Sequence, residues 1–248
     1  MKKARILIAF SITLVILCFS NIPVFAQSSG GDDVARRIDF IQERLDAGKT
    51  DAKRWQYSWM FIHGFSTDLQ FGLAATQTDN DEEEDRYDNV VGGISSLLAV
   101  GDLTFNPLVA WNAADKLRAL PDKTSEEKKA KLRYAEQLLK DCADREESGR
   151  SWKTHALSGL VSLIGGAAIA MDEDEDNDHR YDDGAAFLIS SMLVAEIQIF
   201  TMPTRAMADW KDYSAITGDK FETGMNPSPP NRFFISANPK GIFCTILF

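Results

Sequence analysis

The sequence has few residues suited to nucleophilic or redox chemistry. Its 248 residues include three cysteines and three histidines, and His179 lies in a highly charged stretch. Nucleophilic catalysis needs a base beside the attacking serine or cysteine. We also find no nucleophile elbow, phosphate-binding loop, zinc-spaced cysteine set or dinucleotide fingerprint. These absences favour a protein that is not an enzyme.

Basic residues are also scarce, because 27 lysines and arginines face 37 acidic residues, for a formal charge of −10. A protein that binds nucleic acid needs a basic surface to contact phosphates. We therefore expect no nucleic-acid partner.

The first residues are typical of an export signal. Lys2, Lys3 and Arg5 precede an apolar run over residues 6–19, and small residues suited to cleavage end at Ala26. The alternative is an uncleaved membrane anchor. Export predicts a location in the bacterial cell envelope, in the inner membrane or the periplasm.

Two cysteines follow this segment, Cys142 and Cys244. In an oxidising compartment they could form a disulfide bond, and the alternative is two free thiols.

Two amphipathic helices are expected outside the apolar runs. Residues 32–47 place apolar side chains on one face, and Gly48 is expected to end that helix. Residues 125–147 have a similar apolar stripe, beginning at Ser125 and followed by acidic residues. We expect both helices to pack outside the main core and to offer surfaces to partners.

An internal repeat dominates the rest of the chain. Residues 58–81 align without a gap with residues 151–174, and both segments lead into an acidic stretch that ends in Arg-Tyr-Asp. The segments after these stretches, 86–107 and 180–203, share Ile-Ser-Ser and a closing proline. We therefore predict two copies of one helical hairpin.

The predicted fold is all-α, with a four-helix core made of the two hairpins, extra amphipathic helices and a short C-terminal β-hairpin. The tail pattern predicts two short strands joined near Asn238 and Gly241. The predicted units are a signal peptide at 1–26, an amphipathic helix at 27–49, a first hairpin at 50–120, a connecting helix at 121–147, a second hairpin at 148–215 and the tail at 216–248.

The four apolar runs are each long enough to span a bilayer, and tryptophans at their ends suit a membrane interface. Polar residues within the first and fourth runs, including His63, Asp68 and Glu196, and a basic segment at 116–153 that would stay outside, speak against insertion. The alternative is a water-soluble bundle with a tight core of small residues.

The acidic stretch at 172–183 suggests a cation site. Asp172, Asp174, Asp176 and Asp178 alternate as in a calcium loop, but the glycine at the sixth position and the glutamate at the twelfth are missing. Weak Ca²⁺ or Mg²⁺ binding is one interpretation, and a hydrated turn is the other.

A second hypothesis concerns the hairpin interiors. Counting about 1.5 Å per helical residue places His63, Asp102, His155 and Glu196 at similar distances from the acidic turns. Two imidazoles and two carboxylates in one layer could bind a transition metal or relay protons. The alternative is that the histidines lie near the helix ends and the acids pair locally with arginine or lysine.

The sequence as a whole predicts a non-enzymatic exported envelope protein, a membrane-associated helical bundle with a structural or protein-interaction role. Its expected partners are the membrane, and another protein or a second copy of the chain. The alternatives are a soluble periplasmic bundle that binds a cation or ligand, and a metal-dependent or ion-conducting protein that uses the His/carboxylate layer.

Overall fold

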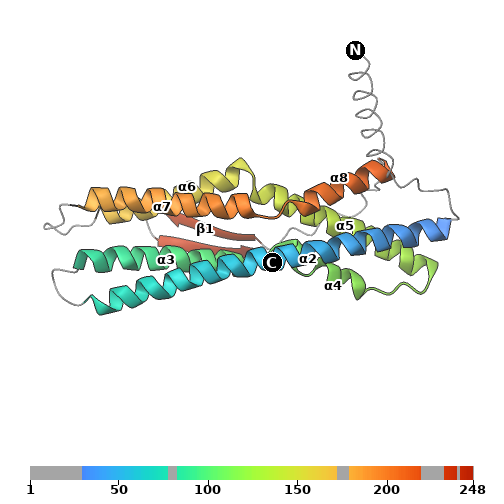
Figure 1. Cartoon of the computed structure of the whole chain (residues 1–248), viewed down its shortest axis with the longest axis horizontal. Coiled ribbons are helices and arrows are strands. Elements are labelled where there is room, and N and C mark those ends of the chain that lie inside the picture. The colour runs from blue at the N-terminus through green and yellow to red at the C-terminus, as the bar shows by residue number, and fades with distance from the viewer. Residues whose placement is uncertain (1–29, 78–82, 172–178, 219–231, 239–240, 248) are drawn as a thin grey trace, which may run out of the picture.

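A computed structural model describes residues 30–77, 83–171, 179–218, 232–238 and 241–247, which are mostly helical and form an elongated molecule (Figure 1). The prediction of a mainly helical chain is confirmed. The elements are α2 (Gly30–Thr76), α3 (Glu83–Phe105), η2 (Val109–Trp111), α4 (Ala113–Arg118), α5 (Ser125–Gly149), α6 (Trp152–Ala170), α7 (Arg180–Thr201), α8 (Arg205–Thr217), β1 (Arg232–Asn238) and β2 (Gly241–Leu247). The predicted signal peptide at 1–26 lies outside the described residues.

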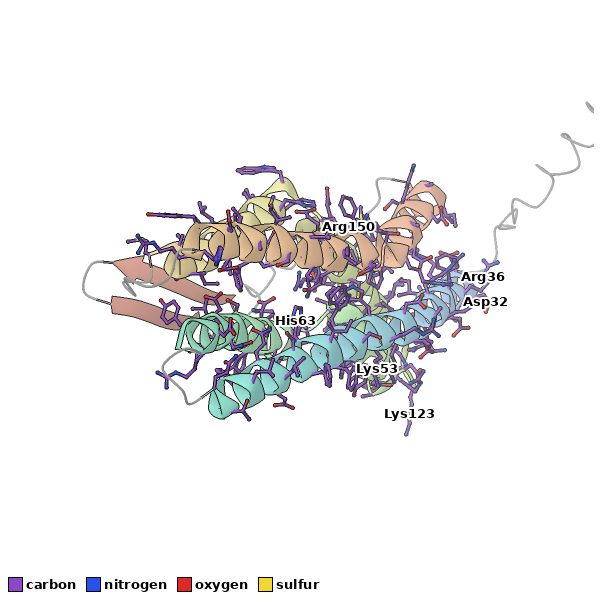
Figure 2. All side chains as sticks on the ribbon, turned by 60° about the vertical axis from the view of Figure 1, so that its left-hand side comes forward. Asp32, Arg36, Lys53, His63, Lys123 and Arg150 are labelled. Carbon is purple, nitrogen blue, oxygen red and sulfur yellow. The ribbon has the colours of Figure 1, made fainter. Side chains whose placement is uncertain are left out.

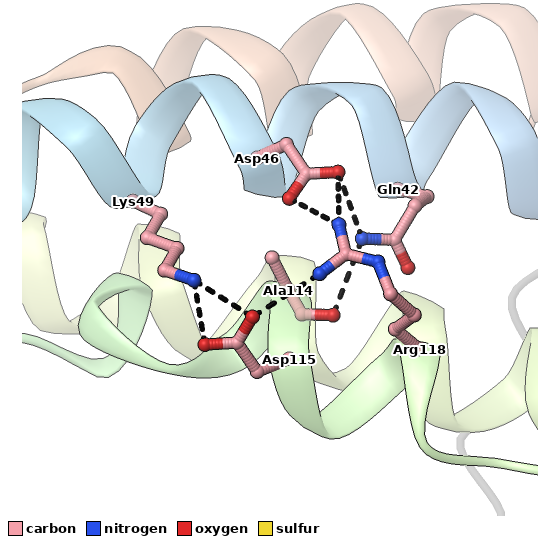
Figure 3. A network of polar contacts seen from close by, with 6 residues as sticks. All are labelled: Gln42, Asp46, Lys49, Ala114, Asp115 and Arg118. Atoms are coloured by element: carbon pink, nitrogen blue, oxygen red, sulfur yellow. Dashed lines mark hydrogen bonds and ion pairs between the residues drawn. The ribbon is translucent and has the colours of Figure 1, made fainter.

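Helix α2 continues through Gly48, so the prediction that this glycine ends a helix was wrong. A glycine inside a helix costs only about 1 kcal/mol relative to alanine, and packing can offset that. Ion pairs to α4 hold α2 on both sides of the glycine (Figure 3). Arg118 contacts Asp46 at 2.6 Å, and Lys49 contacts Asp115 at 2.6 Å.

The largest buried apolar cluster lies around the N-terminal half of α2, with η2, α4, α5 and α8. We call this region, residues 30–56, 108–149 and 202–217, the basal bundle. Its fully buried side chains include Ile41, Leu117 and Leu139. The two amphipathic helices therefore supply the core, which differs from the expectation that they pack outside it.

Polar side chains inside the basal bundle are paired. Glu136 of α5 accepts hydrogen bonds from Arg37 of α2 and from the Tyr213 hydroxyl of α8. Arg37 also donates to the Tyr213 oxygen at 2.8 Å. This three-helix contact satisfies groups that would be costly to bury alone.

Helix α5 begins with a complete capping box. The Thr124 hydroxyl accepts from the backbone N–H of Glu127, and the Glu127 carboxylate accepts from the N–H of Thr124. The sequence signal near Ser125 therefore located the start of this helix to within a residue.

The C-terminal part of α2 packs along α3, and α6 packs along α7. We call these pairs, residues 57–105 and 152–201, the apolar hairpins. The helix ends that flank the two acidic turns lie at the end of the molecule opposite the basal bundle (Figure 1). Helices α3 and α6 also contact each other, so the two hairpins touch.

Helices α6 and α7 approach to backbone contact at two glycines. A Cβ atom placed on Gly166 would lie 2.5 Å from the carbonyl oxygen of Gly184, and one on Gly184 would lie 2.5 Å from the oxygen of Gly166. No larger residue fits either position without moving the helices. Close crossings of this kind are typical of helices packed through small residues.

Strand β1 pairs with β2 in antiparallel register, with Arg232 opposite Leu247 and Asn238 opposite Gly241. Within the helical part of the chain, Cys142 is a buried free thiol and forms no disulfide bond. Burial raises the pKa of this thiol well above its ordinary value, so it stays protonated.

Candidate functional site at the junction of the bundle and the hairpins

The C-terminal end of α7 is where the basal bundle and the apolar hairpins meet, and Arg150 holds it. The Arg150 guanidinium donates to the carbonyl oxygens of Ile199, Phe200 and Met202 at 2.9–3.3 Å (Figure 2). The last carbonyls of a helix lack partners within the helix, and a cation there also suits the helix dipole. Arg150 therefore fixes the point at which α7 turns towards α8.

Two buried tryptophans of α2 contact the same end of α7. The indole N–H groups of Trp55 and Trp59 donate to the Thr201 hydroxyl at 3.3 and 3.1 Å. Thr201 in turn donates to the carbonyl oxygen of Ile197 at 2.8 Å. One hydroxyl thus joins α2 to α7.

A third contact between these helices lies farther along the hairpins. His63, which is 8% exposed, contacts the Gln198 side chain at 2.9 Å (Figure 2). His63 lies between the ribbons of the two hairpins, on the side of α2 that faces α7. The polar side of α2 therefore faces inwards.

Polar contacts also link α2 to α3. The Ser96 hydroxyl donates to that of Ser66 at 3.1 Å, and Gln70 donates to Ser66 at 2.7 Å. The hairpins thus carry polar groups between their helices.

The second histidine of the predicted layer pairs with one of the layer's two carboxylates. His155 Nδ1 lies 2.8 and 2.9 Å from the two carboxylate oxygens of Glu196. This pair joins α6 to α7 within one hairpin, and both side chains are about one quarter to one third exposed. The pair is a local ion pair when His155 is protonated, whereas the alternative interpretation expected the acids to pair with arginine or lysine.

Asp102 has different neighbours. It is exposed, accepts a hydrogen bond from Asn106 at 2.7 Å and interacts electrostatically with Arg145 of α5. Burial lowers the pKa of Arg145, and Asp102 partly offsets that effect.

The structure therefore brings together only His155 and Glu196 of the four residues in the predicted layer. Across the described residues, no three histidine, cysteine or acidic side chains lie close enough to hold a metal ion. His63 instead contacts Gln198 of α7, and Asp102 contacts Asn106, four residues later at the end of its own helix. Asp172, Asp174, Asp176 and Asp178 lie outside the described residues, and cation binding there stays a prediction.

Exposed apolar side chains lie almost entirely on the apolar hairpins. Among the helical residues that the structure describes, every large hydrophobic side chain that is strongly exposed lies within 57–105 or 152–200, except Ile216. Phe61 of α2 is 73% exposed and Leu157 of α6 is 63% exposed. Contiguous apolar patches of this kind mark surfaces that contact lipid or another protein.

By length and composition, the described residues contain one candidate membrane span, Arg180–Thr217, which covers α7 and α8. Only 11% of its most apolar window is buried. The core helix of a water-soluble protein would be mostly buried, so this segment differs from such a helix.

An open groove of about 590 Å³ runs over the junction. Its lining comes from one face of α2 and from the segment that joins α7 to α8. The lining residues are Asp51, Arg54, Trp55, Ser58, Trp59, Ile62, Thr201, Pro203, Thr204 and Arg205.

Sequence reasoning noted the aromatic and basic residues at this end of the hairpins, including Trp55, Trp59 and Arg150, but it did not identify Thr201 or the groove. Thr201 has no distinguishing pattern around it, because its role depends on indoles that lie more than 140 residues earlier in the chain. The repeated pairing of tryptophan with arginine or lysine was the signal present in the sequence.

Comparison with known proteins identifies no relative: no family model, curated protein or solved structure matches this chain.

Proposed function

We propose that this chain is a non-enzymatic, exported protein of the bacterial cell envelope, a membrane-associated helical bundle. The apolar hairpins insert into the bilayer, and the basal bundle remains in water, where it has a structural or protein-interaction role. The observation that carries the proposal is the confinement of exposed apolar side chains to the hairpins.

The energetics favour a lipid environment for these side chains. Burying one large apolar side chain away from water gains roughly 1.5–3 kcal/mol, and the hairpins expose more than twenty of them. The centres of α3, α6 and α7 contain no charged residue over 89–101, 156–171 and 184–195. Such segments can lie in hydrocarbon without the cost of burying a charge.

The placement of polar groups supports the same proposal. His63, Ser66 and Gln198 lie between helices, while Phe61 and Leu157 face outwards. Polar side chains inside a membrane bundle face its interior, and apolar ones face the lipid. Asp68 is the exception on α2, where it is exposed, so we place the α6/α7 hairpin deepest.

The lengths of the helices fit a bilayer. Helix α6 has 19 residues and α7 has 22, which corresponds to about 29 and 33 Å at about 1.5 Å per residue. The hydrocarbon core of a bilayer is about 30 Å thick. The acidic turns would then lie in water on one side of the apolar layer, and the basal bundle on the other.

The finer features of the fold belong to this proposal. The two hairpins are copies of one ancestral unit, their four arms share one interior, and the tail forms a β-hairpin. The shared interior is supported by the contact between α3 and α6 and by the pairing of His63 with Gln198. The export step follows from the signal pattern in residues 1–26.

Accessibility to a membrane-impermeant maleimide tests insertion. All three native cysteines are replaced, and one cysteine is introduced at Leu160, which is 51% exposed on α6. In open membrane fragments we expect no labelling of Leu160→Cys until detergent is added. The matched control is Lys129→Cys on the exposed face of α5, which we expect to be labelled in both conditions.

Extraction with alkaline carbonate gives a second readout. We expect the chain to remain in the membrane pellet. Release into the supernatant, together with labelling of Leu160→Cys in water, would contradict insertion. A large soluble assembly with Leu160→Cys protected would instead show that a second copy covers the apolar surface.

A further inference from the structure

The groove at the junction differs from the rest of the hairpin surface because it is charged at one end and apolar at the other. Arg54 and Arg205 lie at its basal end, and Ile62 lies at its hairpin end. Arg54 and Ile62 are eight residues apart on α2, which is about 12 Å along the helix. Between them lie Trp55 and Trp59, whose ring nitrogens are already bound to Thr201.

Arg54 supplies a cation that pairs with no acidic residue in the part of the chain that the structure describes, and its side chain is exposed. Arg205 is partly neutralised, with Asp51 at 3.6 Å and Asp209 at 3.7 Å, both longer than a direct hydrogen bond. The groove therefore has free positive charge within a chain whose formal charge is −10.

The N-terminal amides of α8 do not contribute to this charge. The Glu146 carboxylate accepts a hydrogen bond from the N–H of Met207 at 3.1 Å and also interacts with the N–H of Ala206. These amides are therefore occupied from inside the bundle. Any anion in the groove would be held by the two guanidinium groups and by the hydroxyls of Ser58 and Thr204.

We propose that this groove binds one anionic phospholipid. Its phosphate contacts Arg54 and Arg205, and one acyl chain lies over Trp59 and Ile62 towards the hairpins. The inference rests on the proposed insertion of the hairpins, because that insertion places the groove at the level of lipid headgroups. Arginine beside tryptophan at this level suits a headgroup and the upper part of an acyl chain.

Quenching of tryptophan fluorescence by brominated lipids tests the inference. The full chain is reconstituted into phosphatidylcholine vesicles that contain a small fraction of brominated phosphatidylglycerol or of brominated phosphatidylcholine. We expect the anionic lipid to quench at several-fold lower mole fraction, because Trp55 and Trp59 lie in the groove. Arg54→Glu should remove this preference, and Arg54→Lys should retain most of it.

The matched control is Arg133→Glu, an exposed residue of α5 far from the groove lining. It makes the same change of charge, and we expect its lipid preference to match that of the unchanged protein. One basic residue near an anionic surface corresponds to about a fivefold change in binding. Arg54→Glu should therefore lower the preference about fivefold or more, while quenching by phosphatidylcholine stays the same.

Three results would overturn the lipid site. The first is equal quenching by the two lipids, and the second is an equal loss of the lipid preference in Arg133→Glu. The third is full displacement of the lipid by millimolar glycerol phosphate in water, because the ligand would then be a free phosphate. An absence of quenching by either brominated lipid would instead contradict insertion itself. The experiment therefore separates a failure of the proposed lipid site from a failure of the proposed membrane insertion.

Discussion

The basal bundle and the apolar hairpins are both helical, yet they place their apolar side chains in opposite ways. In the bundle, leucine and isoleucine are buried, as Leu139 is on α5, and the few charged side chains that are buried, such as Glu136, have polar partners. In the hairpins, leucine faces outwards and His63 is buried. The bundle therefore has the distribution of side chains expected in water, and the hairpins have the one expected in the proposed lipid environment.

The comparison shows that the most apolar segments of a chain need not form its buried core. The most apolar helices, α6 and α7, contribute few side chains to the largest buried cluster. Helix α5 has many charges and contributes several, because its apolar residues form one continuous stripe. Burial in water depends on that arrangement more than on total hydropathy.

The largest expected effect comes from making the same leucine-to-alanine substitution once in the bundle and once in the hairpins. Leu139→Ala removes a side chain that is 1% exposed and should lower the free energy of unfolding by about 2–5 kcal/mol. Leu160→Ala, at 51% exposure, should change it by less than about 0.5 kcal/mol. Denaturant unfolding in mild detergent measures both, and equal losses would contradict the assignment of the core.

A second prediction concerns pH and belongs to the bundle alone. Burial raises the pKa of Glu146 from 4.5 to about 7, although hydrogen bonds from the backbone of Met207 and Ala206 act in the opposite direction. Because the folded protein holds this proton more tightly than the unfolded chain, its contribution to stability is complete below pH 4.5 and is lost as pH rises to about 7. The loss should be up to about 3 kcal/mol.

Unfolding of the unchanged protein and of Glu146→Gln between pH 4.5 and 8 measures this contribution. We expect the pH dependence to be weaker in the variant, since glutamine does not titrate. Identical slopes in the two proteins would rule out Glu146 as the source.

The third prediction tests the packing of the hairpins. Gly184→Ala places a Cβ atom 2.5 Å from a backbone oxygen and 2.9 Å from the Ala170 side chain, so it should destabilise the α6/α7 contact by about 1–3 kcal/mol. Gly64→Ala meets nothing within 4 Å and should be neutral or stabilise α2 by up to about 1 kcal/mol. The prediction concerns the difference in stability between the two variants. Thermal unfolding in lipid or detergent measures it. Equal shifts would mean that α6 and α7 are not in backbone contact.

The smallest expected effect concerns the start of α5. Thr124→Ala removes the hydroxyl that caps this helix and should cost about 1 kcal/mol. Lys129→Ala, a change on the exposed face of the same helix, should have almost no effect. The free energy of unfolding measures both, and a full-size loss in Lys129→Ala would show that the cap is not the cause.

Much of the helical layout could be predicted from local patterns. The periodic apolar residues and the acidic stretches located the hairpin arms, and Ser125 followed by acidic residues marked the start of α5, whose cap is the preceding Thr124. The continuity of α2 through Gly48 could not be predicted, because it depends on Lys49 and Asp46 meeting residues of α4 about seventy positions away.

The location of the core was also beyond the sequence. An amphipathic stripe shows that a helix needs an apolar partner, but it does not identify that partner. The stripes of 32–47 and 125–147 cover each other together with α4 and α8, so they form a core of their own. For the candidate site, counting residues placed four side chains in one layer but could not show which of them meet: His155 contacts Glu196, whereas His63 faces Gln198, because helical rotation decides which neighbour a side chain meets.

Helix α2 has 47 residues and belongs to both regions without a break, a length of about 70 Å. Asp46 and Lys49 are held by α4 in its N-terminal half, and His63 is held by α7 in its C-terminal half. In the proposed membrane-bound state, a partner that tilts the N-terminal half of α2 would also tilt the half that packs along α3, because one continuous helix joins them.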